Sequence, residues 1–237
     1  MKKLIGNKEF YKKLFAVALP IMLQNGISNF VSLLDNIMVG RLGTEQMSGV
    51  SRVNQLIFIF FLCLFGAVGG IGIFTAQYAG QENDEGIRYT FRFKLIVGLV
   101  ILGLFAAVFI LKDDELISLY LHEGSKEGDL AATLEYAKQY LSVIMIGIIP
   151  IVFEQVYSST LRECGETVVP MVASIIAVFV NLVLNYVLIF GNFGAPRLGV
   201  VVAALATIIS RFIQAGIVIL YVHTHAANQT YIIGMYS

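Results

Sequence analysis

The chain has 237 residues, of which 57% are hydrophobic and only 14% are charged, and its mean hydropathy is +0.80. Soluble domains average about 45–50% apolar and about 25% charged residues, so this composition excludes an ordinary soluble domain. The formal net charge is zero, which argues against a nucleic-acid partner, because such proteins carry a basic field.

Long apolar runs recur along the chain, and each is long enough to cross a bilayer as a helix. They predict six transmembrane spans, at about 14–39, 54–78, 93–111, 140–160, 168–190 and 198–222. We therefore expect an all-α, polytopic membrane protein built as a bundle of six transmembrane helices. The expected organisation is a basic N-terminus (1–13), a six-helix lobe (14–222) and a tail (223–237), without a cleavable leader.

The loops predict the orientation in the membrane. Lysines and arginines concentrate before span one, between spans two and three, and between spans four and five. The alternate loops carry fewer of them, and the loop between spans three and four (112–130) is mainly acidic. By the positive-inside rule, both termini are expected to be cytoplasmic.

Span one carries a polar stripe. Gln24, Ser28, Ser32 and Asp35 recur at helical spacing, and a neighbouring row contains Asn25, Asn29 and Asn36. Such a stripe within a membrane lines a cavity or faces a partner helix. An intramembrane carboxylate costs about 2.5–3.5 kcal/mol on insertion scales, so Asp35 is a functional-site candidate, with an interfacial helix end as the alternative.

Three further polar residues lie at a depth similar to that of Asp35. Asn181 and Asn185 are four residues apart on span five and share one helix face. At the helical rise, Asn181 lies about 15 Å, Thr207 about 12 Å and Asp35 about 8 Å from the outer ends of their spans. If these spans adjoin, the set is all oxygen, which suits Na⁺ or a proton held by Asp35 and does not suit zinc.

Two other charged residues fall within spans. Glu154 on span four and Arg211 on span six have similar estimated depths, and an unpaired charge there would be costly. The sequence predicts a buried Glu154–Arg211 ion pair, with snorkelling of Arg211 to the cytoplasmic interface as the alternative.

Other patterns were assigned structural roles. Arg88, Arg92 and Lys94 lie at the start of span three and are predicted to anchor it against lipid headgroups. The acidic cluster at residues 113–115 is predicted to lie in a solvated loop. Glycines and an alanine at spacings of four in span two predict close helix packing; they are Gly66, Gly70, Gly72, Ala76 and Gly80. The common hydrolase, P-loop and zinc motifs are missing from the sequence, which predicts that the chain is not an enzyme.

Four sequence pieces resemble the multidrug and toxic compound extrusion (MATE) family of cation-coupled exporters. They are ALPIMLQNGISNFVSLLDNIMVGRLGTEQMSGV, TAQYAGQEND, LRECGETVVPM and VNLVLNYVLIFGNFGAPRLGVVVAALAT, in collinear order between about Phe15 and Tyr221. The resemblance implies two six-helix bundles related by a pseudo-two-fold axis. It also implies export of bulky organic cations and related drugs in exchange for Na⁺ or H⁺, without a cofactor.

The resemblance also implies a cation site in the amino-terminal bundle. The positions that match it are Asp35, Asn181, Asn185 and Thr207, although Asn185 stands where some members carry a second acid. The implied drug cavity is lined by Gln24, Asn25, Ser28, Asn29 and Ser32. The chain matches only the amino-terminal half of such a fold, so a second six-helix lobe is expected from elsewhere.

The sequence therefore predicts one lobe of an antiporter in the plasma membrane, with small organic cations or drugs and the lipid bilayer as partners. Two alternatives stay open. One is a lipid-linked oligosaccharide flippase of the same superfamily, for which only Arg52 and Arg211 could bind a pyrophosphate. The other is a non-transporting membrane scaffold or assembly module.

Overall fold

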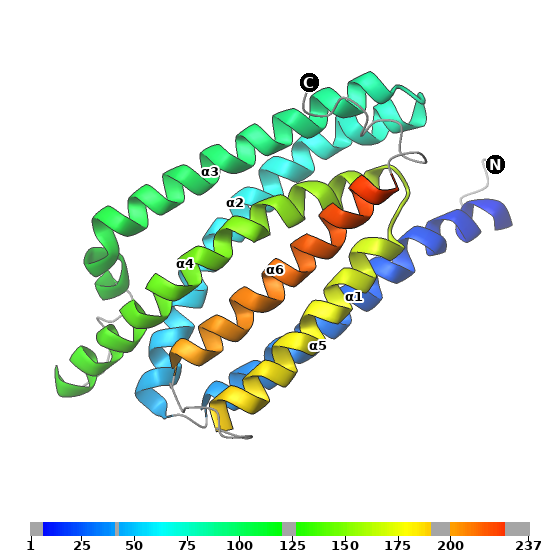
Figure 1. Ribbon diagram of the computed structural model, residues 1–237. Coiled ribbons are helices and arrows are strands. Elements are labelled where there is room, and N and C mark those ends of the chain that lie inside the picture. The colour runs from blue at the N-terminus through cyan, green and yellow to red at the C-terminus, as the bar shows by residue number, and fades with distance from the viewer. Residues whose placement is uncertain (1–6, 41–42, 120–126, 191–199, 226–237) are drawn as a thin grey trace, which may run out of the picture.

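The computed structural model describes residues 7–40, 43–119, 127–190 and 200–225. Over these residues the chain forms six α-helices and no strand: α1 (Lys8–Gly40), α2 (Thr44–Gly80), α3 (Asp84–Leu119), α4 (Glu127–Glu163), α5 (Val168–Phe190) and α6 (Val200–Thr224). The helices lie alongside one another, and α1 begins at the end of the bundle where α6 ends (Figure 1). The predicted all-α bundle of six helices is confirmed.

Most of the helices are longer than the spans predicted for them. Helices α2 and α4 have 37 residues each, which is about 55 Å at the helical rise, against a hydrocarbon core of about 30 Å. The prediction of a loop at 112–130 is therefore wrong at both ends, because α3 continues to Leu119 and α4 begins at Glu127. The acidic cluster at 113–115 lies on helical backbone, and its side chains are outside the described part of the structure.

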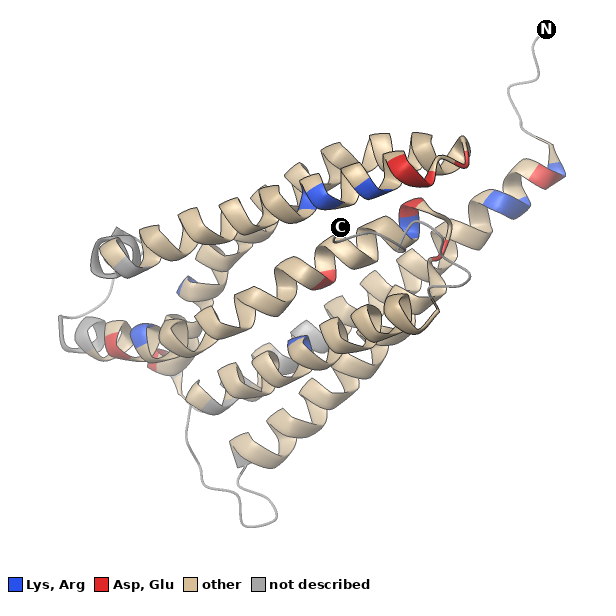
Figure 2. Cartoon of the chain, turned by 45° about the horizontal axis from the view of Figure 1, so that its top comes forward, with Lys and Arg blue, Asp and Glu red and all other residues tan. Residues whose placement is uncertain are grey.

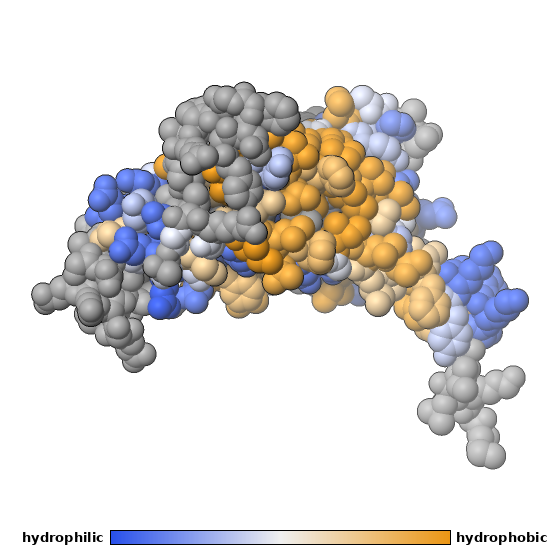
Figure 3. Space-filling view, turned by 90° about the horizontal axis from the view of Figure 1, so that it is seen from below, coloured by the Kyte–Doolittle hydropathy of each residue, from blue (hydrophilic) through white to orange (hydrophobic). Residues whose placement is uncertain are grey.

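The bundle carries an apolar belt. Within the described residues, α2 to α6 each contain a stretch long and apolar enough to cross a membrane. Charged residues gather toward the two ends of the bundle (Figure 2), and apolar side chains cover the middle of the face seen in Figure 3. The many exposed Phe, Leu and Ile side chains on α2 and α3 fit a surface that faces lipid.

Helix α4 lies at the centre of the packing and contacts α2, α3 and α6. Two clusters of buried apolar side chains run along it, one toward each end of the bundle. Helix α1 packs along α5 and touches α2 only weakly, and among its described side chains the partly buried Met38 packs against these clusters. The bundle is consequently open between α1 and α2, and this is where the cavities described below lie.

Of the predicted glycines, Gly72 does lie close to a neighbouring helix, because a methyl group placed on it would overlap the Glu163 side chain of α4. Two further close approaches occur at glycines that were not predicted. A methyl group placed on Gly49 of α2 would lie 2.9 Å from the Thr133 carbonyl of α4. One placed on Gly147 of α4 would lie 2.8 Å from Ile208 Cγ1 of α6. By contrast, the predicted contact positions Gly66, Gly70 and Gly80 have nothing within 4 Å, so that prediction is wrong for them. These glycines lie on exposed faces of α2, where the surrounding space is available to lipid.

Candidate functional site

The structure brings the three neutral residues of the predicted cation site together. Asn185 Nδ2 donates to Asn181 Oδ1 at 3.2 Å, and Asn181 Nδ2 donates to Thr207 Oγ1 at 3.3 Å. The Thr207 hydroxyl in turn donates to the Ala203 carbonyl at 3.0 Å, one helical turn earlier. Asn181 and Asn185 are 6% and 2% exposed. Because α5 and α6 pack side by side, the Asn181 amide meets the hydroxyl on α6, and the spacing of four on α5 places the Asn185 amide against Asn181.

The acidic member of the predicted site, Asp35, lies on the backbone of α1, and its side chain is outside the described residues. The next residue, Asn36, lines the same cavity as Asn185 and Thr207. The turn of α1 that carries Asp35 therefore borders the cavity wall formed by α5 and α6.

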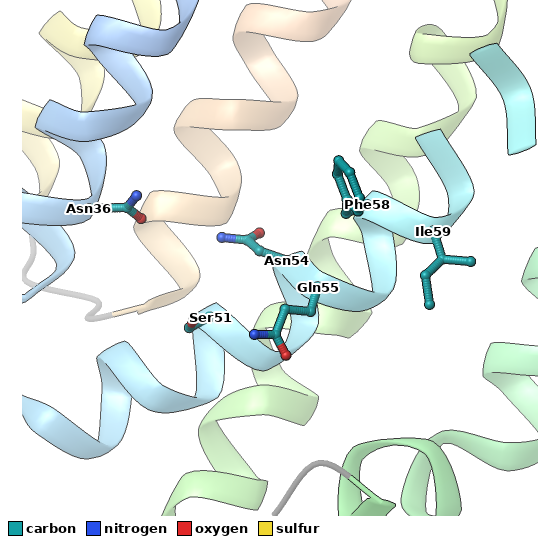
Figure 4. Close-up of a pocket in the computed structure, with 6 residues that line it drawn as sticks. All are labelled: Asn36, Ser51, Asn54, Gln55, Phe58 and Ile59. Carbon is teal, nitrogen blue, oxygen red and sulfur yellow. The ribbon is translucent and has the colours of Figure 1, made fainter. Parts of the chain in front are cut away.

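This cavity, of about 310 Å³, lies where α1, α2, α4, α5 and α6 meet. Its polar lining consists of Asn36, Asn54, Tyr140, Asn185, Thr207 and Arg211, and its apolar lining of Val50, Ile57, Phe58, Phe61 and Ala203. We name it the α1–α2 cavity. A second hollow of about 590 Å³ adjoins it, because Asn36, Asn54 and Phe58 line both. In Figure 4 the side chain of Asn36 on α1 points toward Asn54 on α2 across this second hollow.

The polar stripe of α1 divides between two directions. Gln24 is buried, and its Oε1 accepts a hydrogen bond from Arg162 Nη2 at 3.4 Å. Ser28 Oγ lies 3.4 Å from Ser174 Oγ on α5, while Asn25 and Asn29 are exposed. These four residues do not line the α1–α2 cavity or its adjoining hollow. The side chain of Ser32, the fifth residue predicted to line the drug cavity, is outside the described residues.

The sequence reasoning missed several residues of the cavity wall. Tyr140 Oη on α4 donates to Asn54 Oδ1 on α2 at 3.3 Å, and this pair forms one side of the cavity. Asn54 and Tyr140 are the first residues of two predicted spans, 54–78 and 140–160, and neither was singled out from the sequence. Both residues lie at the outer ends of their predicted spans, and this similar depth was the feature of the sequence that could have indicated their contact.

The predicted Glu154–Arg211 ion pair is not formed. Glu154 is buried on α4, where its carboxylate accepts a hydrogen bond from Ser158 Oγ at 2.7 Å. Arg211 Nη1 donates instead to Gln214 Oε1 at 3.0 Å, within α6. Among the described side chains, oppositely charged groups within 4.0 Å are found for Glu9 with Lys13 and for Lys94 with Glu163. Equal depth did not bring Glu154 and Arg211 into contact, because depth gives only the position of a residue along the membrane normal. It does not say which face of each helix the residue lies on.

The buried ion pair lies elsewhere, and it corrects the role predicted for Lys94. Its side chain is 0% exposed and forms an ion pair with Glu163 at the end of α4. Lys94 Nζ also donates to Thr160 Oγ1 at 3.2 Å and to Ser159 Oγ at 3.4 Å. Lys94 therefore ties α3 to α4 in the interior and does not reach lipid headgroups.

With this geometry established, comparison with known proteins identifies the family. The model of the MatE family matches residues 20–187, which is more than half of the chain. The chain belongs to the MatE family. A probable multidrug resistance protein NorM from Thermotoga maritima is 33% identical over 213 residues, covering 88% of this chain and 44% of that protein. One of the same name from Bacillus subtilis is 26% identical over 237 residues, covering 98% of this chain and 50% of that protein.

Solved structures agree on the fold. An outward-facing conformation of a multidrug resistance MATE family transporter superimposes with a TM-score of 0.72 at 25% identity, covering 89% of this chain and 44% of that one. The chain thus spans about half the length of the MATE relatives it matches. The relatives carry multidrug resistance names, and the comparisons do not favour the flippase alternative over drug export.

Proposed function

We propose that this chain is the amino-terminal lobe of a secondary active antiporter in the plasma membrane, with both termini cytoplasmic. It would export organic drugs, organic cations in particular, in exchange for Na⁺ or H⁺. Membership of the MatE family supports the class. The observation that carries the proposal is the convergence of Asn185, Thr207 and the α1 residue Asn36 on one cavity between helices.

Coupling is proposed to rest on one acidic and three neutral residues. Asp35 would bind the ion, and Asn181, Asn185 and Thr207 would supply neutral oxygens, as hard cations prefer. With Asn185 in place of a second acid, a single carboxylate would compensate the ion. Occupation of this site would shift α1, where Pro20 is the expected point of flexure, and so reshape the α1–α2 cavity.

Alternating access moves one bundle against another around a central site. This chain supplies one bundle, so we propose that a second six-helix lobe completes the transporter. That lobe would come from further sequence, a partner chain or a second copy.

Drug export is the direct test. The chain would be co-expressed with the carboxyl-terminal half of the Thermotoga relative in cells that lack other efflux pumps, and the efflux of a fluorescent organic cation would be measured. We expect ion-dependent efflux that needs both halves and is lost in Asp35→Asn. If the chain is expressed as a stable monomer and gives no efflux, either alone or together with the carboxyl-terminal half, the scaffold alternative would be favoured.

The cation site has a separate test that does not need transport. Na⁺ at about 100 times its Kd would stabilise the folded chain by about 2.7 kcal/mol relative to K⁺ at equal ionic strength. We expect Thr207→Val to remove most of this difference. Thr224→Val is the matched control, because the Thr224 hydroxyl makes the same bond to a carbonyl one turn earlier, at 2.8 Å from Leu220 O, on an exposed face. Equal loss of Na⁺ stabilisation in both variants would remove Thr207 from the site.

A further inference from the structure

Arg211 lies in the wall of the α1–α2 cavity. It follows Thr207 by four residues on α6, so the two side chains share one helix face. Asn185 of α5 and Asn54 of α2 line the same space. Arg211 therefore brings a permanent positive charge to the wall of the space that the proposed function assigns to ion and drug.

The guanidinium is incompletely paired within the described structure. Nη1 donates to Gln214, whereas Nε is buried and has no hydrogen-bond partner among the described residues. No described carboxylate lies within 4.0 Å of it, since the Glu154 carboxylate accepts from Ser158 instead. Arginine stays protonated in proteins, and an uncompensated charge at membrane depth is costly, which marks such residues as functional.

The rest of the lining indicates what the guanidinium would bind. The other described polar groups are neutral amides and hydroxyls, and Phe58, Phe61 and Tyr140 provide aromatic surface. A planar guanidinium binds a carboxylate through two parallel hydrogen bonds. One guanidinium matches one carboxylate, whereas a pyrophosphate calls for several positive groups. A ligand that is only cationic would meet like charge in this cavity.

We propose that Arg211 makes the α1–α2 cavity select amphipathic aromatic ligands that carry a carboxylate, zwitterions included, over ligands that are only cationic. The inference rests on the proposed drug-export function and narrows its substrate class, from organic drugs with cations in particular to aromatic drugs that carry a carboxylate, with or without a cationic group.

The test uses a matched pair of probes and the full 237-residue chain. One probe is a zwitterionic xanthene dye with an aryl carboxylate, and the other is the methyl ester of the same dye, which keeps the cation and lacks the carboxylate. Binding is followed by fluorescence anisotropy in nanodiscs of phosphatidylcholine, so that no anionic lipid competes. We expect the acid to bind at least about tenfold more tightly than the ester, as for a charge-assisted bond.

Variants then assign the preference to one residue. Arg211→Gln should weaken binding of the acid by about 10- to 100-fold and leave the ester unchanged or tighter. Arg211→Lys should keep part of the preference for the acid over the ester, because the positive charge remains but the bidentate hydrogen bonding to the carboxylate is lost. Arg52→Gln, on α2 and outside the cavity lining, is the control and should leave the ratio of affinities unchanged. A preference for the acid that survives Arg211→Gln would overturn the assignment.

The remaining outcomes separate the inference from the function. Equal affinities in the unmodified chain overturn the selection, yet they leave drug binding standing. A preference that appears only in Asp35→Asn means that the Asp35 carboxylate already neutralises Arg211, and this also overturns the inference. If neither dye binds, the inference fails and the cavity loses its proposed role in drug binding as well.

Discussion

The buried ion pair between Lys94 and Glu163 allows a quantitative prediction, because its two partners are unequally buried. Lys94 is 0% exposed and also donates to the hydroxyls of Ser159 and Thr160, whereas the Glu163 side chain is 17% exposed. Removing one member of a buried pair leaves an uncompensated charge, which destabilises by about 3–5 kcal/mol. Because Lys94 is more deeply buried than Glu163, the structure predicts that the loss of stability depends on which of the two residues is replaced.

Glu163→Gln leaves an ammonium group sealed between α3 and α4, so we expect the full destabilisation of about 3–5 kcal/mol. Lys94→Met leaves a carboxylate that can turn toward solvent, so we expect a smaller loss, of about 1–3 kcal/mol. The double variant removes both charges together, and replacing a buried pair by neutral groups is often close to neutral. It should therefore be more stable than Glu163→Gln alone, with a coupling energy of about 2 kcal/mol or more.

Unfolding of the detergent-solubilised chain by SDS titration, followed by circular dichroism, measures all three variants. The exposed pair Glu9–Lys13 of α1, whose nitrogen–oxygen distance is 3.8 Å, supplies the control cycle and should show no measurable coupling. Additive losses in the Lys94–Glu163 cycle would refute the reasoning. So would a larger loss for Lys94→Met than for Glu163→Gln, because the burial difference would then not set the magnitude.

Three glycine substitutions on α2 and α4 test how closely these helices pack against their neighbours. A methyl group at Gly72 would overlap Glu163 Oε1, whose carboxylate pairs with Lys94, so Gly72→Ala should destabilise the chain by about 1–3 kcal/mol in the same SDS titration. Gly70 has open space around it and is the control. Gly70→Ala should be neutral or should stabilise the chain by up to about 1 kcal/mol. Gly147→Ala should destabilise by about 1–3 kcal/mol, because the new methyl lies 2.8 Å from Ile208 Cγ1; thermal unfolding should show partial rescue by Ile208→Ala, and the absence of rescue would contradict the contact.

All six helices were predictable from the sequence, and so were the ends of α5, whereas the ends of α2, α3 and α4 were not. Hydropathy marks only the part of a helix that needs an apolar solvent, and the apolar runs located all six helices. Beyond the bilayer a polar segment such as 112–119 can continue the same helix, since its backbone bonds are satisfied internally. The acidic composition of that segment therefore said nothing about whether it forms a loop.

The neutral residues of the candidate site were predictable for a related reason. Asn181 and Asn185 share a face at spacing four, and Thr207 has a similar depth on the next helix in the chain. Because α5 and α6 are joined by a short connection and pack side by side, similar depth was enough to bring them into contact. Residues at the same depth meet only if their helices are neighbours in the bundle, and helices joined by a short connection are usually neighbours.

The same argument explains the failures at the charged residues. Lys94 and Glu163 are 69 residues apart in the chain and pair because α3 and α4 contact each other, a fact that no periodicity records. Glu154 and Arg211 also lie on contacting helices, α4 and α6, yet each makes its described hydrogen bond within its own helix. Contact between helices is therefore necessary for pairing without being sufficient, because the rotation of each helix about its axis decides which faces meet. That rotation places Arg211 in the cavity wall rather than against Glu154, so the residue for which the sequence predicted an ion pair is the one to which we assign ligand choice.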